Sequence, residues 1–430
     1  MTSPQFIALA VLIAVIAGLI SGKARSEVIA LTGAAVLLIT RTIRPVEVQG
    51  AFASPAIIAL ASLFIIVYAM ELSGLLGLMI HYATRLCRRL GVAGLWGVIA
   101  LSGVASAFVN NTPIVVLTAP VIRDVAASLS LPARRFLIPL SYATILGGAC
   151  TLIGTSTNLL VNDMARNAGQ PVFSLFEVTP VALCIALAGG IYLFLLGGRL
   201  LAASPGGPAI NLPQRAESAA GDDPALFPVN RPFRPWAGTV SLLVFAAVVA
   251  GAALNLAPIA ACAFAGAVLL IVTGTISADD AYKGLRPEIL LLIAGMVVIG
   301  LSLEVTGLAG LVTHALLGWV NAAGPFWALA LLYGATLFLT EILSNAAVAV
   351  LVTPIAVALA ESLGVSPRPF LVAVMMAASA AFATPFGYQT NVLVYQIGGY
   401  SYLDFVKIGV PLNLLTWAVG VLVIPVFFPF

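Results

Sequence analysis

Long apolar runs separated by short polar breaks extend along almost the whole chain. Runs such as 56–70, 181–196 and 411–430 approach the length that a helix needs to cross a bilayer. Strand-like alternation of apolar and polar residues is absent, so the runs predict helices. The pattern predicts an all-α polytopic membrane protein, with crossings near residues 6–20, 28–40, 56–72, 136–163 and 178–197 in the first half and near 237–254, 258–274, 289–305, 370–395 and 409–428 in the second.

Two longer apolar stretches, 92–127 and 327–361, lie between the third and fourth crossing of each half. Each is interrupted near its middle by a polar motif that contains asparagine. A polar tip between two short helices is typical of a re-entrant hairpin, because non-helical backbone at membrane depth needs protein or a water-filled cavity around it. We therefore expect one hairpin in each half.

Three polar motifs of the first half return in the second half, in the same order and about 233 residues later. Such a duplication is the usual sequence sign of a secondary transporter, whose site lies where the repeats meet. We expect a first transmembrane repeat (1–197), a cytoplasmic linker (198–236) and a second repeat (237–430). The motif pairs are 71–77 with 304–310, 110–112 (Asn-Asn-Thr) with 344–346 (Ser-Asn-Ala), and 154–158 (Gly-Thr-Ser-Thr-Asn) with 387–391 (Gly-Tyr-Gln-Thr-Asn).

Composition and charge support a membrane protein and orient it. The chain is 61% hydrophobic and 8% charged, whereas soluble domains carry about 25% charged residues. Its net charge of +3 does not suggest a nucleic-acid partner. With both termini outside a plasma membrane (the bacterial inner membrane), only Arg41, Arg44, Arg166 and Arg368 fall outside, and the other fifteen of the 19 basic residues fall on the cytoplasmic side, in agreement with the positive-inside rule. Five crossings per half then predict two inverted repeats.

The polar breaks offer oxygen ligands and helix ends at membrane depth. Broken helices expose carbonyl oxygens, which suit sodium, and helix N-termini, which attract anions. Gly154 and Gly387 each precede a Thr-Asn pair in the fourth crossing, and glycine lets a backbone carbonyl approach a ligand closely. One break can therefore hold a cation on one side and an anion on the other. The hairpin tips contain Ser106, Asn110, Asn111 and Thr112 in the first repeat, and Thr340, Ser344 and Asn345 in the second.

These motifs make the chain similar to the divalent anion/sodium symporters, a family that carries dicarboxylates, citrate or sulfate. Relatives have a Ser-Asn-Thr signature at each hairpin tip, matched here at 110–112 and 344–346. The residues at 154–158 and 387–391 look most like those of a branch of proposed sulfate permeases. The resemblance covers essentially the whole chain, but the soluble domains that many members of this branch insert between the halves are missing here.

The resemblance implies a homodimer in the lipid bilayer that moves a small anion by an elevator mechanism, in which a transport half slides against a scaffold half. It implies sodium ions as the coupling ions and no other cofactor. Carried over by position, one sodium is held by Ser106, Asn110, Asn111 and Gly154, a second by Thr340, Ser344, Asn345 and Gly387, and the anion lies near Asn111, Thr112, Thr155, Ser156, Ser344, Asn345, Tyr388 and Gln389.

Two departures from the family pattern concern the substrate. Ala346 stands where relatives have a threonine at the second tip, which removes a hydroxyl donor. The Pro-Pro pairs that relatives often have in the broken helices are replaced by Ser-Thr at 156–157 and Gln-Thr at 389–390. Sulfate and carboxylates both stay open as substrates.

Two other functions are consistent with parts of the pattern. Glu341, beside the second tip, has no carboxylate counterpart in the first repeat, and a carboxylate inside the membrane is a functional candidate. A sodium/proton or arsenite-type carrier in which Glu341 titrates is the first alternative. An intramembrane enzyme is the second, although amides repeated in both halves argue against a nucleophile–base pair. No P-loop is present, and the single histidines (His81, His314) and cysteines (Cys87, Cys150, Cys184, Cys262) do not suggest a metal site or a disulfide.

Overall fold

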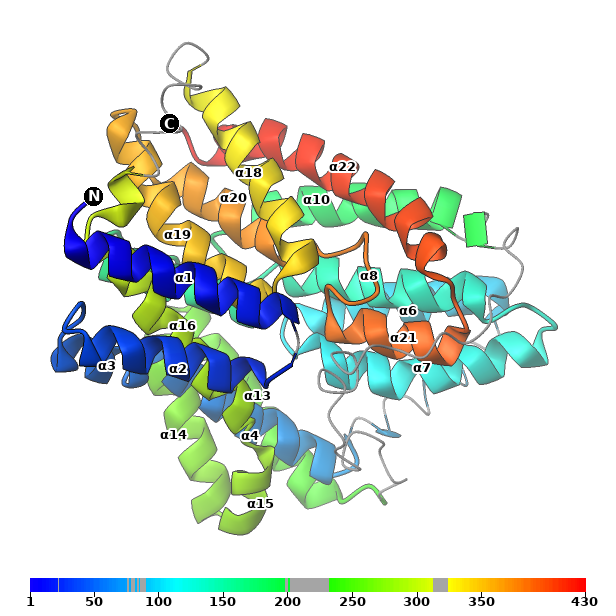
Figure 1. Ribbon diagram of the computed structural model, residues 1–430. Coiled ribbons are helices and arrows are strands. Elements are labelled where there is room, and N and C mark those ends of the chain that lie inside the picture. Colours follow the sequence, from blue (N-terminus) through cyan, green and yellow to red (C-terminus); the bar gives the residue numbers. More distant parts are fainter. Residues whose placement is uncertain are drawn as a thin grey trace.

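The computed structural model describes residues 1–21, 23–75, 77–78, 82, 85, 90–197, 200–201, 232–311 and 324–430. Within these ranges the regular structure is helical (Figure 1). Most of the predicted linker, together with His81, Cys87 and His314, lies outside the described residues. The first half contains α1 (Ser3–Ser21), α2 (Ser26–Ile39), α3 (Pro45–Phe52), α4 (Pro55–Leu72), α6 (Val92–Ser106), α7 (Asn111–Ser128), α8 (Arg134–Gly148), α9 (Ser156–Asn167), α10 (Thr179–Tyr192) and the π-helical segment η1 (Leu193–Gly197). The second contains α13 (Pro235–Ala253), α14 (Ile259–Val272), α15 (Ala278–Gly284), α16 (Pro287–Val305), α18 (Pro325–Ile342), α19 (Asn345–Ser362), α20 (Arg368–Ser379), α21 (Gln389–Gly398) and α22 (Tyr402–Phe427).

The helices of the two halves correspond to one another along the chain. Helices α1 to α4 match α13 to α16, the pair α6–α7 matches α18–α19, the pair α8–α9 matches α20–α21, and α10 matches α22. Among the described residues, eight helices are long and apolar enough to cross a membrane, and four shorter apolar helices accompany them. The predicted all-α polytopic fold with two inverted repeats is confirmed.

Each predicted hairpin consists of two helices joined by a short polar tip. In the first repeat α6 ends at Ser106 and α7 begins at Asn111, with Asn110 as its N-cap. In the second repeat α18 ends at Ile342 and α19 begins at Asn345, with Ser344 as its N-cap. Asn and Ser are favoured at this position because their side-chain oxygens accept hydrogen bonds from the first turn. The two tips therefore end where the asparagine motifs predict.

The fourth crossing of each repeat is broken, also as predicted. Helix α8 ends at Gly148 and α9 starts at Ser156, so residues 149–155 form the first break loop. Helix α20 ends at Ser379 and α21 starts at Gln389, so residues 380–388 form the second break loop. Each break loop therefore contains the glycine, Gly154 or Gly387, that was expected to interrupt the crossing.

Two short helices, α3 and α15, were not expected from the sequence. Both lie between the second and third crossing of their repeat. Helix α15 has only seven residues and begins at the N-cap Ser277, whose hydroxyl accepts from the backbone N–H of Asp280 at 3.1 Å. Elements of this length show too few turns for a clear apolar period, which is why they were missed.

The helices form two groups (Figure 1). One group contains α1 to α4 and α13 to α16, in which α2 packs on α16 and α4 packs on α14. The other contains both hairpins and both broken helices, together with α10 and α22. The groups meet where α16 packs on α19 and α4 contacts α9. At this boundary the Ser54 hydroxyl donates to the Asp163 carboxylate at 2.5 Å.

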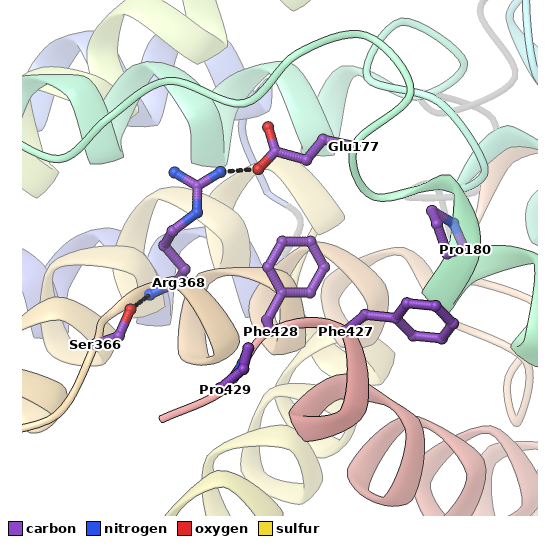
Figure 2. A pocket seen from close by; sticks show the side chains of 7 residues that line it. All are labelled: Glu177, Pro180, Ser366, Arg368, Phe427, Phe428 and Pro429. Atoms are coloured by element: carbon purple, nitrogen blue, oxygen red, sulfur yellow. Dashed lines mark hydrogen bonds and ion pairs between the residues drawn. The ribbon is translucent and has the colours of Figure 1, made fainter.

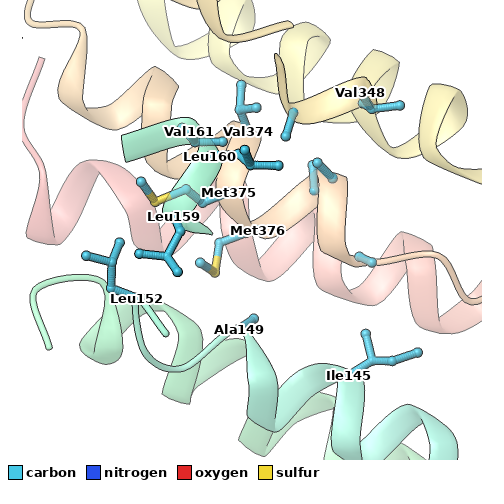
Figure 3. Close-up of a cluster of buried hydrophobic side chains, with 14 of the residues drawn as sticks. Ile145, Ala149, Leu152, Leu159, Leu160, Val161, Val348, Val374, Met375 and Met376 are labelled. Carbon is cyan, nitrogen blue, oxygen red and sulfur yellow. The ribbon is translucent and has the colours of Figure 1, made fainter. Parts of the chain in front are cut away.

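The core of the second group lies between its two broken helices (Figure 3). Leu160 of α9, Met375 of α20 and Val348 of α19 are fully buried members of this core. Small residues allow close helix contact elsewhere in this group: a Cβ atom built on Gly147 of α8 would lie 1.9 Å from the carbonyl oxygen of Gly103 in α6. Such contacts are how membrane helices gain packing energy without a hydrophobic driving force, and here they hold the hairpins against the broken helices.

Candidate functional site

The first hairpin tip and the first break loop bring several oxygen atoms close to two glycines. The Ser106 hydroxyl donates to the side-chain oxygen of Asn111, and both residues are almost completely buried. A Cβ atom on Gly154 would lie 2.4 Å from the carbonyl oxygen of Gly148, 2.7 Å from that of Ala107 and 2.8 Å from that of Ser106. A Cβ atom on Gly148 would lie 2.6 Å from Asn111 Oδ1. We call these four oxygens, around Gly148 and Gly154, the first oxygen cradle.

The second hairpin tip repeats the arrangement with a different set of oxygens. The Thr340 hydroxyl lies 2.8 Å from two acceptors, Asn345 Oδ1 and the carbonyl oxygen of Ala378. A Cβ atom on Gly387 would lie 3.1 Å from the Thr384 hydroxyl and 3.2 Å from a carboxylate oxygen of Glu341. The nearest atom to that position is the Ala381 Cβ, at 2.8 Å, so Gly387 faces a methyl group and two side-chain oxygens, one of them from a carboxylate, rather than three carbonyls.

Two threonines that sequence reasoning missed hold the break loops to the tips. Thr151 donates from its hydroxyl to the carbonyl oxygen of Ala107 and accepts from the Gly154 N–H at 3.1 Å. Thr384 contacts Glu341 and accepts from the Gly387 N–H at 3.1 Å. The two threonines are 233 residues apart, so the repeat offset could have found them.

The asparagines of the broken helices close the same loops. Asn158 donates to the carbonyl oxygens of Ala149 and Thr151, at 3.1 and 2.9 Å. Asn391 donates to those of Ala381 and Thr384, at 2.8 and 3.3 Å. Both asparagines are completely buried. Each one therefore fixes the break loop of its own repeat.

Glu341 accepts four hydrogen bonds. Its donors are the backbone N–H groups of Ala383 and Thr384 at 2.7 and 2.9 Å, the Thr384 hydroxyl at 2.9 Å and Asn413 Nδ2 at 2.7 Å. The carboxylate thus connects the second tip, the second break loop and α22, a role that the sequence did not reveal.

The two repeats meet at the first hairpin tip. Asn111 Nδ2 donates to the Tyr388 hydroxyl at 2.8 Å, and the Thr112 hydroxyl donates to Gln389 Oε1 at 3.2 Å. These bonds bring the N-termini of α7 and α21 together, although 277 residues separate the partners. Four of the residues predicted for anion binding therefore lie side by side.

The equivalent contact at the second tip is different. Asn345 Nδ2 is buried and has no hydrogen-bond partner among the described residues, and the Thr112 counterpart is Ala346. Helix α9, which starts at Ser156, packs along α19. The hydroxyl of Thr155, just before it, donates to Thr157 at 3.3 Å. The donor group of Asn345 is therefore unused.

Two predicted sodium ligands have a structural use. Asn110 Oδ1 accepts from the N–H of Thr112, and the Ser344 hydroxyl accepts from the N–H of Ala347, both at 3.4 Å. Each side chain caps the helix that follows its tip. Their roles as ligands, like those of the other predicted site residues, stay predictions.

Comparisons with known proteins agree with this architecture. The sequence matches the citrate transporter family over residues 11–364 and 345–429. An uncharacterized transporter of Synechocystis is 25% identical, with 92% of each chain covered. Sodium/sulfate cotransporter 1 of Chlamydomonas reinhardtii is 37% identical over 151 residues, which are 35% of this chain and 17% of that protein.

A solved structure shares the fold. The crystal structure of the YdaH transporter of Alcanivorax borkumensis has a TM-score of 0.61 and 16% identity, and the match covers 88% of this chain and 86% of that one. The family and these proteins are transporters, which confirms the predicted class of protein and excludes the enzyme alternative. The resemblance found from the motifs is likewise confirmed, and the chain belongs to the citrate transporter family.

Proposed function

We propose that this protein is a sodium-coupled symporter of a small divalent anion, either sulfate or a di- or tricarboxylate. The observation that carries the proposal is the meeting of two kinds of group at each hairpin tip. Oxygen atoms lie close to the break-loop glycine, and a helix begins at the end of the same tip. Such a tip suits a cation and an anion that move together.

The first oxygen cradle fits a sodium ion by its chemistry. Its members are carbonyl and amide oxygens, which carry no proton and accept a hard cation. A side chain at position 154 would push these oxygens apart, since its Cβ would lie under 3.0 Å from three carbonyl oxygens. At the second tip, Thr340, Asn345 and the backbone near Gly387 are the proposed ligands, with the Glu341 carboxylate beside them.

The anion is proposed to lie between the two tips. Helices α7, α9, α19 and α21 begin there, and helix N-termini favour negative charge. The Nδ2 of Asn345, which has no partner among the described residues, is proposed to donate to the anion. Thr112 and Tyr388, whose hydroxyls already bond Gln389 and Asn111, and Ser156 at the start of α9 are proposed to lie near it. Sulfate is supported by the relative named as a sodium/sulfate cotransporter, and carboxylates by the family description.

An elevator mechanism is supported by the division into two helix groups. Both tips and both break loops belong to one group, so that group can carry the proposed site as a unit. The remaining helices would form the scaffold and the contact between the subunits of a homodimer. The basic residues favour a bacterial plasma membrane with both chain ends outside.

The decisive experiment is uptake of radiolabelled sulfate into proteoliposomes under an inward sodium gradient, with unlabelled succinate and citrate as competitors. We expect uptake that requires sodium. Inhibition by the carboxylates would widen the substrate to several dianions, and lack of inhibition would restrict it to sulfate. If neither sulfate nor succinate accumulates, and sodium/proton exchange is seen instead, the proposal is wrong.

A further inference from the structure

A buried ion pair joins the start of the first broken helix to the other repeat. Arg134 is the first residue of α8, and its Nη2 donates to an Asp404 carboxylate oxygen at 2.8 Å. The guanidinium carbon lies 5.2 Å from the centre of the Tyr400 ring, and the Tyr400 hydroxyl donates to the Arg134 carbonyl oxygen. Only 2% of the Asp404 side chain is exposed. We call Arg134, Tyr400 and Asp404 the first clamp.

A second set with the same chemistry lies at the start of the other broken helix (Figure 2). Arg368 is the first residue of α20; its guanidinium binds Glu177 and lies 4.2 Å from the centre of the Phe173 ring. Its Nη1 also donates to the Pro171 carbonyl oxygen at 3.2 Å. Arg368 and Glu177 line a cavity of about 360 Å³. We call Arg368, Phe173 and Glu177 the second clamp.

The two clamps are related by the repeat symmetry. Arg368 follows Arg134 by 234 residues, while both the aromatic residue and the acid of one clamp are 227 residues from those of the other. In each clamp the arginine belongs to one repeat, and the aromatic ring and the carboxylate belong to the other. An arginine that stacks on a ring and binds a carboxylate has little freedom, because its planar group is held from two directions.

Each clamp holds an element that supports the proposed site. In the helix that the first clamp holds, α8 supplies the Gly148 carbonyl oxygen of the first oxygen cradle and the Ser141 hydroxyl, which donates at 2.7 Å to Asn391, in the first turn of α21 after the second break loop. Behind the second clamp, residues 173–179 reach the first break loop. There the N–H of Leu152 donates to the Leu175 carbonyl at 3.0 Å, and the Thr179 hydroxyl donates to the Cys150 carbonyl at 2.6 Å.

We propose that the two clamps are positioning elements for the ion sites: each fixes the broken helix of one repeat against residues at or just before the start of the last helix of the other, and so sets the distance between the two tips. The expected effect of the clamps on sodium binding rests on the proposed function, whereas their expected effect on the rigidity of the break loops does not. We expect the first clamp to contribute more to this positioning than the second. The side chains of its ion pair are 18% and 2% exposed, against 25% and 32% in the second, and removing one partner of a buried ion pair costs more because the other charge is left unpaired.

The test is a double-mutant cycle on the first clamp. Arg134→Gln, Asp404→Asn and the double variant remove the charges, while Asn at 404 keeps an oxygen for the cap of α22. Arg134→Lys keeps the charge as a rescue variant. Arg123→Gln with Asp124→Asn removes an exposed ion pair (57% and 65% exposed) as the matched control.

Two measurements are made on the purified protein in lipid. The first is the sodium concentration for half-maximal sulfate uptake, which Arg134→Gln should raise about tenfold, with little further change in the double variant. The second is amide hydrogen exchange in the break loops 149–155 and 380–388, which should become faster in Arg134→Gln and recover in Arg134→Lys. In the Glu177→Gln variant, we expect a smaller increase in the rate of amide exchange in loop 149–155.

The outcomes separate this inference from the proposed function. Unchanged exchange in both break loops, with extra exchange only near residues 134 and 404, would overturn the positioning role. Equal effects in the Arg123 and Asp124 controls would also overturn it. Absence of sulfate uptake in the unaltered protein would count against the proposed function alone, because the exchange measurement does not depend on transport.

Discussion

Replacing Gly154 by alanine tests the first oxygen cradle directly. The added Cβ would lie 2.4 Å from the Gly148 carbonyl oxygen, whereas Cβ atoms almost never come within 3.0 Å of a non-bonded heavy atom from elsewhere in the chain. The carbonyl must therefore retreat by at least 0.6 Å, or the break loop must shift. Two further carbonyls, those of Ser106 and Ala107, lie within 2.8 Å of the same position. The methyl group would thus displace the carbonyl oxygens that are the proposed sodium ligands.

The expected magnitude follows from the cost of overpacking. Inserting a methyl group into a packed site costs about 1–3 kcal/mol, and a coupling free energy of that size changes an affinity about 5- to 150-fold. We expect Gly154→Ala to raise the sodium concentration for half-maximal sulfate uptake by at least about fivefold. Sodium should also stabilise the variant less against heat than it stabilises the unaltered protein.

The assay is sodium-dependent uptake into proteoliposomes, with the amount of folded protein measured by size-exclusion chromatography. Gly97→Ala is the matched control, because this glycine lies in the same hairpin and an added Cβ meets nothing within 4 Å. We expect the control to keep the sodium dependence of the unaltered protein. A Gly154→Ala variant with that same sodium dependence would refute the assignment of these oxygens to a cation.

The remaining predictions concern the other site residues. Asn111→Ala and Asn345→Ala should each abolish sodium-dependent uptake in a folded protein, and wild-type uptake in both would remove these residues from the site. Asn111→Ala should also lower stability by about 1–3 kcal/mol, because the Ser106 and Tyr388 hydroxyls lose a buried partner. Glu341→Gln should lower both the melting temperature and uptake, because the new NH2 group would face N–H and O–H groups that donate hydrogen bonds to the carboxylate. Glu361→Gln, at an exposed position, is the control. A Glu341→Gln variant that folds normally and changes only the pH dependence of transport would favour the proton-coupled alternative. Ala346→Thr should shift the substrate preference toward carboxylates, and an unchanged competition profile would show that this residue does not face the anion.

Much of the fold could be predicted because the membrane makes the signals local. A segment that crosses a bilayer must be apolar along its whole length and satisfy its own backbone, so each crossing is visible in a short window of sequence. The polar tips and the glycine breaks were found for the same reason, as interruptions in such windows. The short helices α3 and α15 were missed because they have too few residues to show a period.

The contacts of the candidate site were less accessible. The sequence indicated Ser106, Asn111, Thr340 and Asn345, and the structure pairs Ser106 with Asn111 and Thr340 with Asn345 within each tip. These pairs are five residues apart, so local geometry was enough. The four donors to Glu341 come from residues 42 to 72 positions away in two other segments. No local sequence pattern predicts these contacts.

The class of protein, the two repeats and the position of each break follow from local sequence patterns, because hydrophobicity and helix-breaking residues act over a few neighbouring positions. Long-range packing, in contrast, pairs Asn111 with Tyr388 and leaves Asn345 Nδ2 without a partner among the described residues. It also binds Arg134 and Arg368 to the opposite repeat. Such pairings depend on how helices that are 190 to 280 residues apart in the sequence pack together. They also depend on the positions at which the two repeats differ, because only the packing determines what each of these positions contacts. Local sequence patterns therefore do not predict which side chains pair across the repeats.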